Sequence, residues 1–94
     1  MTNTLNSAHL LIDYQNDFVD PNGQLYVQQA EKIGAKIAEI LSFCQEHQII
    51  NIASEDRHPE GHVSFASRYG KEPFSPTPDG RDLLWPDHCI AGTW

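Results

Sequence analysis

Two short apolar runs on either side of one long helical pattern constrain the fold more than any other feature of this sequence. The runs occupy residues 8–13 and 49–54, and neither alternates with polar residues. Continuous apolar runs are typical of strands buried on both faces of a parallel sheet. Between them, apolar side chains recur with a period of about 3.6 residues, at Ile33, Ile37, Ile40, Leu41 and Cys44. Residues 28–47 are therefore predicted to form a helix, and the whole segment a βαβ unit with a right-handed crossover.

The residues after 54 show no comparable period. Five of the six prolines and four of the six glycines lie in residues 59–94, so we expect mostly loop, with one helical turn near residues 63–69. Asp20-Pro21-Asn22-Gly23 is predicted to be a turn in which Asn-Gly tolerates a positive φ. Two strands and one helix cannot cover both faces of a parallel sheet. We therefore expect residues 1–94 to be an incomplete part of an α/β domain.

The charge and composition exclude some classes of partner. The formal net charge is −7, with only six Lys and Arg residues, which argues against binding nucleic acid or an anionic membrane surface. No apolar run approaches the roughly 20 residues of a membrane-spanning helix, and the first nine residues lack the features of a secretory signal. We expect a cytoplasmic protein in which Cys44 and Cys89 are free thiols.

Each apolar run is followed by a carboxylate. Asp13 ends the first run and Asp56 lies two residues beyond the second. Ligands of open parallel sheets gather outside the carboxyl ends of the strands, so both carboxylates are predicted at one ligand-binding edge. Asp13 taken alone could equally be a turn-forming residue.

A second cluster, Asp56-Arg57-His58-Pro59-Glu60-Gly61-His62, has the residue types of a metal site. In an extended segment, residues i and i+2 point the same way, so Asp56 and His58 could share one cation. Pro59 favours an extended His58, and the following Gly could return His62 to the same place. A carboxylate with imidazoles suits zinc, iron or manganese. The alternative is a pair of ordinary exposed loop histidines.

A third cluster is Leu84-Trp85-Pro86-Asp87-His88-Cys89. His88 could complete the metal ligands, and Trp85 could be a flat apolar wall for an aromatic substrate. The alternatives are a Trp85 that fills a small core and a His88 at the surface. Cys89 could be a nucleophile only with a base or a helix N-terminus nearby. The sequence indicates neither, so we interpret Cys89 as structural.

Together these clusters resemble the nicotinamidase branch of the isochorismatase-like cysteine hydrolases. The matching stretches are LLIDYQNDF (10–18), NGQLYV (22–27), SEDRHPEGHVSFA (54–66) and LWPDHCIAGTW (84–94). They follow the family's order and span nearly the whole chain. The resemblance implies the N-terminal part of a three-layer α/β/α parallel-sheet fold, with residues 1–94 as the N-terminal half of a single isochorismatase-like hydrolase domain.

The resemblance also implies roles for individual residues. Asp13 matches the catalytic aspartate, which deprotonates the nucleophilic thiol. The metal ligands match Asp56, His58 and His88, and His62 matches a position that binds the metal in some members only. The aromatic residues that sandwich the substrate ring match Phe18 and Trp85. One divalent ion is implied, zinc first, with iron or manganese as alternatives.

The reaction implied is hydrolysis of a pyridine carboxamide, nicotinamide, to nicotinic acid and ammonia, as in NAD salvage. The family's catalytic lysine and nucleophilic cysteine follow the WPDHC element and have no counterpart here, since Lys71 precedes that element and Cys44 lies on the helix. The chain alone is therefore expected to be inactive. Whether the complete protein is a homo-oligomer is left open.

Two other functions are compatible with the same residues. In the first, water on the metal is itself the nucleophile and acts on another small amide. In the second, the chain is a truncated, non-catalytic metal-binding remnant. Thiol alkylation of the intact protein distinguishes the first from a cysteine enzyme, and a downstream Lys and Cys in the reading frame would exclude the second.

Overall fold

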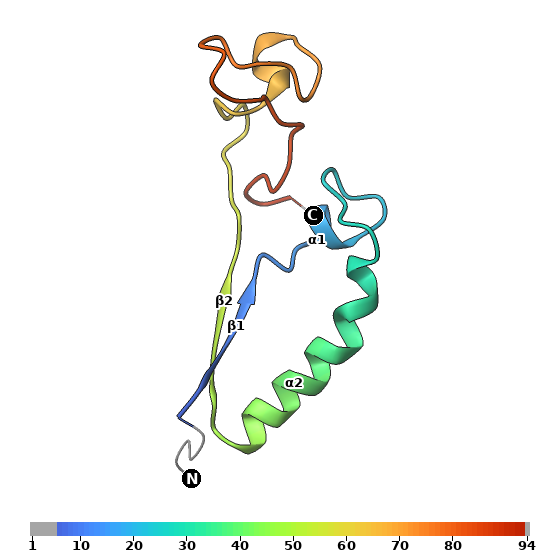
Figure 1. Ribbon diagram of the computed structural model, residues 1–94, viewed down its shortest axis with the longest axis vertical. Coiled ribbons are helices and arrows are strands. Elements are labelled where there is room, and N and C mark those ends of the chain that lie inside the picture. The colour runs from blue at the N-terminus through green and yellow to red at the C-terminus, as the bar shows by residue number, and fades with distance from the viewer. Residues whose placement is uncertain (1–5, 94) are drawn as a thin grey trace.

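The computed structural model describes residues 6–93 and forms an elongated molecule of 54 × 24 × 24 Å (Figure 1). Its regular elements are, in chain order, β1 (Ala8–Ile12), α1 (Asn16–Val19), the 3₁₀ turn η1 (Ala30–Ile33), α2 (Gly34–Glu46), β2 (Ile50–Ser54) and the 3₁₀ turn η2 (Ala66–Tyr69). No helix among residues 6–93 is long and apolar enough to cross a membrane.

The predicted βαβ unit is confirmed. β1 and β2 form a two-stranded parallel sheet whose register runs from Ala8 opposite Ile50 to Ile12 opposite Ser54. α2 is the crossover and lies alongside the two strands (Figure 1). The unit brings the carboxyl ends of both strands to one end of the sheet, where residues 55–93 begin their own lobe.

The helix begins later than its apolar period predicts. Gln29 has a left-handed φ of 70°, so residues 28 and 29 lie outside the helix, and η1 precedes the α-helical turns. α2 starts at Gly34, where a Cβ atom would lie 2.9 Å from the Tyr14 hydroxyl. Gly34 thus permits a close approach between α2 and the loop after β1, which local periodicity does not report.

The expected burial of both strands is wrong for the described residues. All five residues of β2 are exposed, and Ile12 of β1 is 69% exposed. Of the apolar stripe on α2, only Cys44 is buried. The physical reason is coverage: among residues 6–93 one helix faces the sheet, and a two-stranded sheet has no layer on its other face.

The proline- and glycine-rich residues fold around a small core of their own. Phe65 and Leu84 are fully buried, and Phe65 forms a parallel bridge with Trp85. The main-chain N–H of Trp85 donates to the carbonyl of Ser64, and the main-chain N–H of Ala66 donates to that of Trp85. The predicted helical turn is present as η2. This region is mostly loop, as expected, but main-chain hydrogen bonds hold it in shape.

The predicted turn at residues 20–23 forms, with a different use for its glycine. The main-chain N–H of Gly23 donates to the Asp20 carbonyl at 2.7 Å. A Cβ at Gly23 would lie 2.4 Å from the carbonyl oxygen of Asp17. Glycine is therefore required here for close approach to α1, whereas neither Asn22 nor Gly23 has a positive φ.

Candidate metal centre

The two carboxylates predicted at the sheet edge lie there. Asp13 follows β1 directly, and its main-chain N–H donates to the Ser54 carbonyl at 3.1 Å. Its φ of 53° turns the chain out of the strand direction. The Ser54 hydroxyl donates to Asp13 Oδ1 at 2.8 Å. Asp56 lies two residues past the end of β2, at the start of the lobe formed by residues 55–93.

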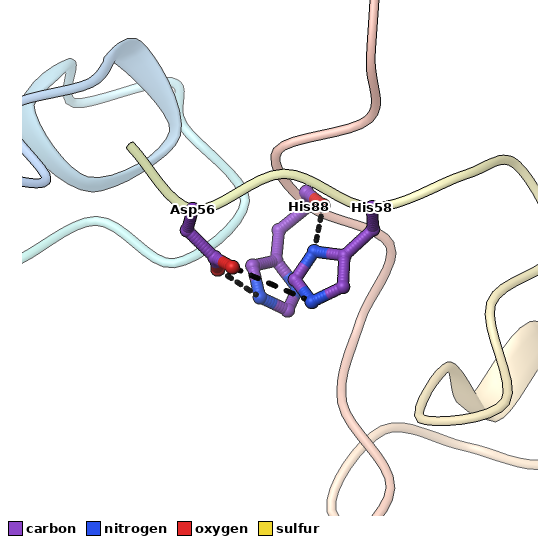
Figure 2. A group of neighbouring side chains, drawn as sticks. All are labelled: Asp56, His58 and His88. Atoms are coloured by element: carbon purple, nitrogen blue, oxygen red, sulfur yellow. Dashed lines mark hydrogen bonds and ion pairs between the residues drawn. The ribbon is translucent and has the colours of Figure 1, made fainter. Parts of the chain in front are cut away.

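Asp56, His58 and His88 form one cluster (Figure 2). One potential ligand atom from each lies within 4.8 Å of the others. His88 Nε2 is 3.2 Å from Asp56 Oδ2, and His58 Nε2 is 3.5 Å from Asp56 Oδ1. Asp56 and His58 come from the same segment, and His88 comes from the C-terminal loop that crosses it (Figure 2). His88 is 7% exposed, so the cluster is closed on that side.

The outer nitrogens of both imidazoles are engaged by the main chain. His58 Nδ1 lies 3.2 Å from the His88 carbonyl, and His88 Nδ1 lies 2.8 Å from the Pro86 carbonyl. A carbonyl only accepts, so Nδ1 of each ring carries a proton, and Nε2 is the nitrogen that faces the cluster and can bind an ion in the neutral ring. Such main-chain partners orient ligating imidazoles in metal sites. One carboxylate and two nitrogen lone pairs thus fit a divalent ion such as zinc.

His62 lies beside this cluster without joining it. Its ring is 4.6 Å from that of His58, centroid to centroid. Its Nδ1 is 2.7 Å from the Ser64 hydroxyl. Among the described residues, the group able to share one ion comprises the other three side chains only.

The two aromatic residues expected to hold a substrate ring both lie near His88. The Phe18 ring is 6.1 Å from the His88 ring, and the Trp85 ring is 6.5 Å from it. Trp85 is 38% exposed and contacts Phe74 edge-on, so it does not fill the core as the alternative interpretation required. Segments 67 residues apart in sequence therefore bring two aromatic rings to the cluster.

Cys89 has the properties of a structural thiol. It is 7% exposed, and burial raises its pKa to about 11, with the negative charge of Asp56 acting in the same direction. A thiol with such a pKa is protonated at neutral pH and is a poor nucleophile. Cys44 is buried on α2, and both thiols are free. The structural interpretation of Cys89 is supported.

Two residues that sequence reasoning missed connect to this cluster. The Gln15 side chain hydrogen-bonds to the main chain of Asp56. The carboxylate of Asp17, 9% exposed, accepts the main-chain N–H of Cys89. The signal in the sequence was weak, since polar residues after a strand are ordinary turn formers.

The chain is similar to nicotinamidases in sequence and in structure. No protein-family profile matches it. The nicotinamidase of Escherichia coli K12 is 41% identical over 88 residues, which cover 92% of this chain and 41% of that protein. The yeast nicotinamidase bound to the inhibitor nicotinaldehyde superposes with a TM-score of 0.76 at 31% identity, over 94% of this chain and 46% of that one. The zinc complex of the Pyrococcus horikoshii pyrazinamidase gives 0.71 at 33% identity, over 93% and 41%.

The extent of these matches defines their scope. This chain spans about two fifths of the length of the curated relatives, 41% of the E. coli protein. Within that span the sequence matches and the structural matches agree, and each covers more than nine tenths of the chain. The two-stranded parallel sheet with its crossover helix is part of the isochorismatase-like fold of those structures, as the sequence predicted. Over nearly its whole length this chain is therefore similar, in sequence and in fold, to part of the nicotinamidases.

Proposed function

We propose that the protein carrying this chain hydrolyses nicotinamide, taking up one water and releasing nicotinic acid and ammonia. One observation carries the proposal: the Asp56, His58 and His88 group has the aromatic rings of Phe18 and Trp85 around it. The similarity to nicotinamidases supports the same reaction. In this role the product would serve NAD salvage, and the free thiols suit a cytoplasmic protein.

A divalent ion would be held by one carboxylate oxygen of Asp56 and the Nε2 atoms of His58 and His88. The Nδ1 contacts to main-chain carbonyls support this, because they leave both Nε2 lone pairs directed to one place. When bound, the ion supplies a Lewis-acid centre for the ring nitrogen of a pyridine carboxamide. Zinc is our first choice, since the P. horikoshii pyrazinamidase was solved with zinc. His62 would lie outside the atoms that bind the ion directly.

Phe18 and Trp85 would bind the substrate ring by its faces and exclude water. Aromatic pairs of this kind contribute roughly 0.5–1.5 kcal/mol beyond area burial. The inhibitor in the yeast nicotinamidase structure, nicotinaldehyde, has the same kind of ring, which supports a pyridine-sized site. A ring held in one orientation presents its carboxamide in one place, and such positioning lowers the barrier of the reaction.

Asp13 would take the proton from the attacking thiol and pass it to the departing ammonia. Its carboxylate stands at the carboxyl end of β1, and the Ser54 hydroxyl fixes one of its oxygens. Neither Cys44 nor Cys89 suits the attack, because both are buried and the pKa of Cys89 is raised. We therefore propose that the nucleophilic cysteine and the catalytic lysine lie outside residues 1–94, in the same domain.

Ammonia release from nicotinamide by the full-length protein tests the proposal, with benzamide as the matched substrate. Benzamide has the same size and carboxamide but lacks the ring nitrogen. We expect turnover of nicotinamide, inhibition by a chelator, and far lower activity on benzamide. A metal-loaded protein that turns over neither amide, or both equally well, would refute the substrate assignment.

A further inference from the structure

We propose that Gln15 and Asp17 are positioning residues, which hold the main chains that carry Asp56 and His88 and so set the geometry of the metal site. The inference rests on the proposed metal site and extends it, because neither Gln15 nor Asp17 belongs to the ligand group. Gln15 directly precedes α1, and Asp17 lies in the first turn of α1, so both follow β1 closely in the chain.

Gln15 pairs with Asp56 as a strand would. Its Nε2 donates to the Asp56 carbonyl at 2.8 Å, and the Asp56 main-chain N–H donates to its Oε1 at 2.6 Å. A primary amide presents a donor and an acceptor side by side, so it can bond to both main-chain polar groups of one residue. The two residues are 41 positions apart, and this contact joins the loop after β1 to Asp56, a candidate ligand.

The side chain is needed because the β1 main chain has already left the sheet. The strand register ends at Ile12 opposite Ser54, and Asp13 turns away with a φ of 53°. Asp56 lies two residues further along, beyond the reach of this pairing. Gln15 extends the hydrogen bonding to Asp56, which fixes where the Asp56 Cα lies relative to β2.

Asp17 does the same for the C-terminal loop. Its Oδ2 accepts the main-chain N–H of Cys89, the residue after His88, at 2.6 Å. Its Oδ1 accepts the main-chain N–H of Gln24 at 3.2 Å. Hydrogen bonds to a carboxylate are charge-assisted and roughly twice as strong as neutral ones. Cys89 has a left-handed φ of 49°, a rare conformation for a residue with a side chain, and the Asp17 bond holds it there.

The third ligand is already tied to the same loop. The main-chain N–H of His58 donates to the Cys89 carbonyl, and that of Ala91 donates to the His58 carbonyl, both at 2.9 Å. His58 and His88 are therefore placed relative to each other by main-chain pairing. Gln15 and Asp17, two residues apart, connect this pair of segments to the end of β1. Removing either contact frees one ligand segment while leaving all three ligands in the sequence.

Cobalt binding to the full-length protein tests this, since Co²⁺ replaces zinc at such sites and its visible absorption reports the ligand geometry. Gln15→Leu removes both bonds at nearly constant volume, and Gln45→Leu, on the exposed face of α2, is its matched control. We expect Gln15→Leu to bind Co²⁺ about 10–100-fold more weakly, the usual effect of losing a residue that hydrogen-bonds to a metal ligand. Its absorption spectrum should also change. Gln45→Leu should match the unaltered protein, and circular dichroism should show all three folded.

A milder variant separates positioning from charge and covers the case in which Gln15→Leu fails to fold. Gln15→Glu keeps the acceptor for the Asp56 N–H, loses the donor, and adds a negative charge near the cation. Electrostatic attraction alone would tighten Co²⁺ binding. We expect weaker binding instead, because the Asp56 carbonyl loses its partner. Asp17→Asn should also weaken binding, since an amide NH2, which is a donor, replaces one of the two oxygens that accept the N–H groups of Gln24 and Cys89.

The outcomes separate this inference from the proposed function. Wild-type Co²⁺ affinity and spectrum in Gln15→Leu, or tighter binding in Gln15→Glu, would overturn the positioning role. His88→Ala is the reference in every series. If His88→Ala loses Co²⁺ while Gln15→Leu and Asp17→Asn keep it, the metal site stands and the positioning role fails. If His88→Ala keeps Co²⁺ unchanged, the metal site itself is wrong.

Discussion

The Ser54 hydroxyl donates a 2.8 Å hydrogen bond to Oδ1 of Asp13, so the last residue of β2 holds the carboxylate that follows β1. The same Ser54 oxygen lies 3.2 Å from the main-chain N–H of Asp13. Both the left-handed turn of Asp13 and the direction of its side chain are thereby fixed from the neighbouring strand. The role proposed for Asp13, taking a proton from a thiol at hydrogen-bond distance, needs this kind of orientation.

Ser54→Ala is expected to lower kcat/KM for nicotinamide about tenfold. A hydrogen bond to a charged group contributes about 1.5–3 kcal/mol, and partial exposure places this bond at the lower end, close to the 1.4 kcal/mol of a tenfold change. Steady-state ammonia release measures the effect, with Ser42→Ala on the exposed side of α2 as the control. Equal loss in both variants, or no loss in Ser54→Ala, would show that the bond has no catalytic effect.

His88→Ala is expected to lose the divalent ion and the amidase activity together. One of the three proposed ligands disappears, and the main-chain partner of His58 Nδ1 lies in the same altered loop. Metal content after dialysis measures the first effect and ammonia release the second. His47→Ala, at the exposed end of α2, is the matched histidine control and should keep both. Full metal occupancy in His88→Ala would contradict its role as a ligand.

The parts of the fold that follow from local pattern were predictable. An uninterrupted apolar run and a 3.6-residue period are visible in any window, so β1, β2 and the end of α2 were predicted within one residue of their observed bounds, whereas the start of α2 was predicted six residues too early. α1, with four residues, is too short to show a period. The start of α2 depends on Gln29 in a left-handed conformation and on contact between Gly34 and Tyr14, neither of which is a local property.

The candidate site divides in the same way. Asp56 and His58 were paired by an i, i+2 spacing, which any extended segment obeys. His88 reaches the cluster only because the C-terminal loop folds back against residue 58. The expectation that it does so came from the family resemblance. Gln15 was missed because its bonds join a side chain to a main chain 41 residues away, and periodicity carries no such information.

Trp85→Ala is expected to raise KM for nicotinamide several-fold while the metal stays bound. The Trp85 ring is 6.5 Å from the His88 ring but supplies no ligand atom, so substrate binding and metal binding should separate. Trp85→Phe keeps an aromatic face and should retain most of the affinity. Kinetics and metal content on the two variants provide the check. An unchanged specificity constant in Trp85→Ala would mean that the ring does not contact substrate.

Cys89→Ala in the full-length protein is expected to retain nicotinamide turnover. Burial raises the pKa of this thiol to about 11, so it stays protonated at pH 7–8 and ionises only as the pH approaches that value. The main-chain N–H that Asp17 accepts is unaffected by the change. Loss of the buried thiol should cost roughly 1 kcal/mol of stability, a typical effect of a point substitution. Abolished turnover with the metal still bound would return Cys89 to consideration as the nucleophile.

Residues 1–94 expressed alone are expected to expose apolar surface and to show no nicotinamide turnover. Ile12 is 69% exposed and Ile50 is 62% exposed, and each strand of the two-stranded sheet has an unpaired edge, so association is favoured. Dye binding to apolar surface and light scattering measure the first property. Ammonia release in the presence of zinc, iron or manganese measures the second. The expected inactivity follows from the thiols, since Cys44 is buried and Cys89 has its raised pKa.

Adding the remaining part of the family's domain as a separate chain should reduce dye binding and restore turnover together. Turnover by the purified 94-residue chain that survives thiol alkylation would overturn the cysteine mechanism in favour of direct attack by water.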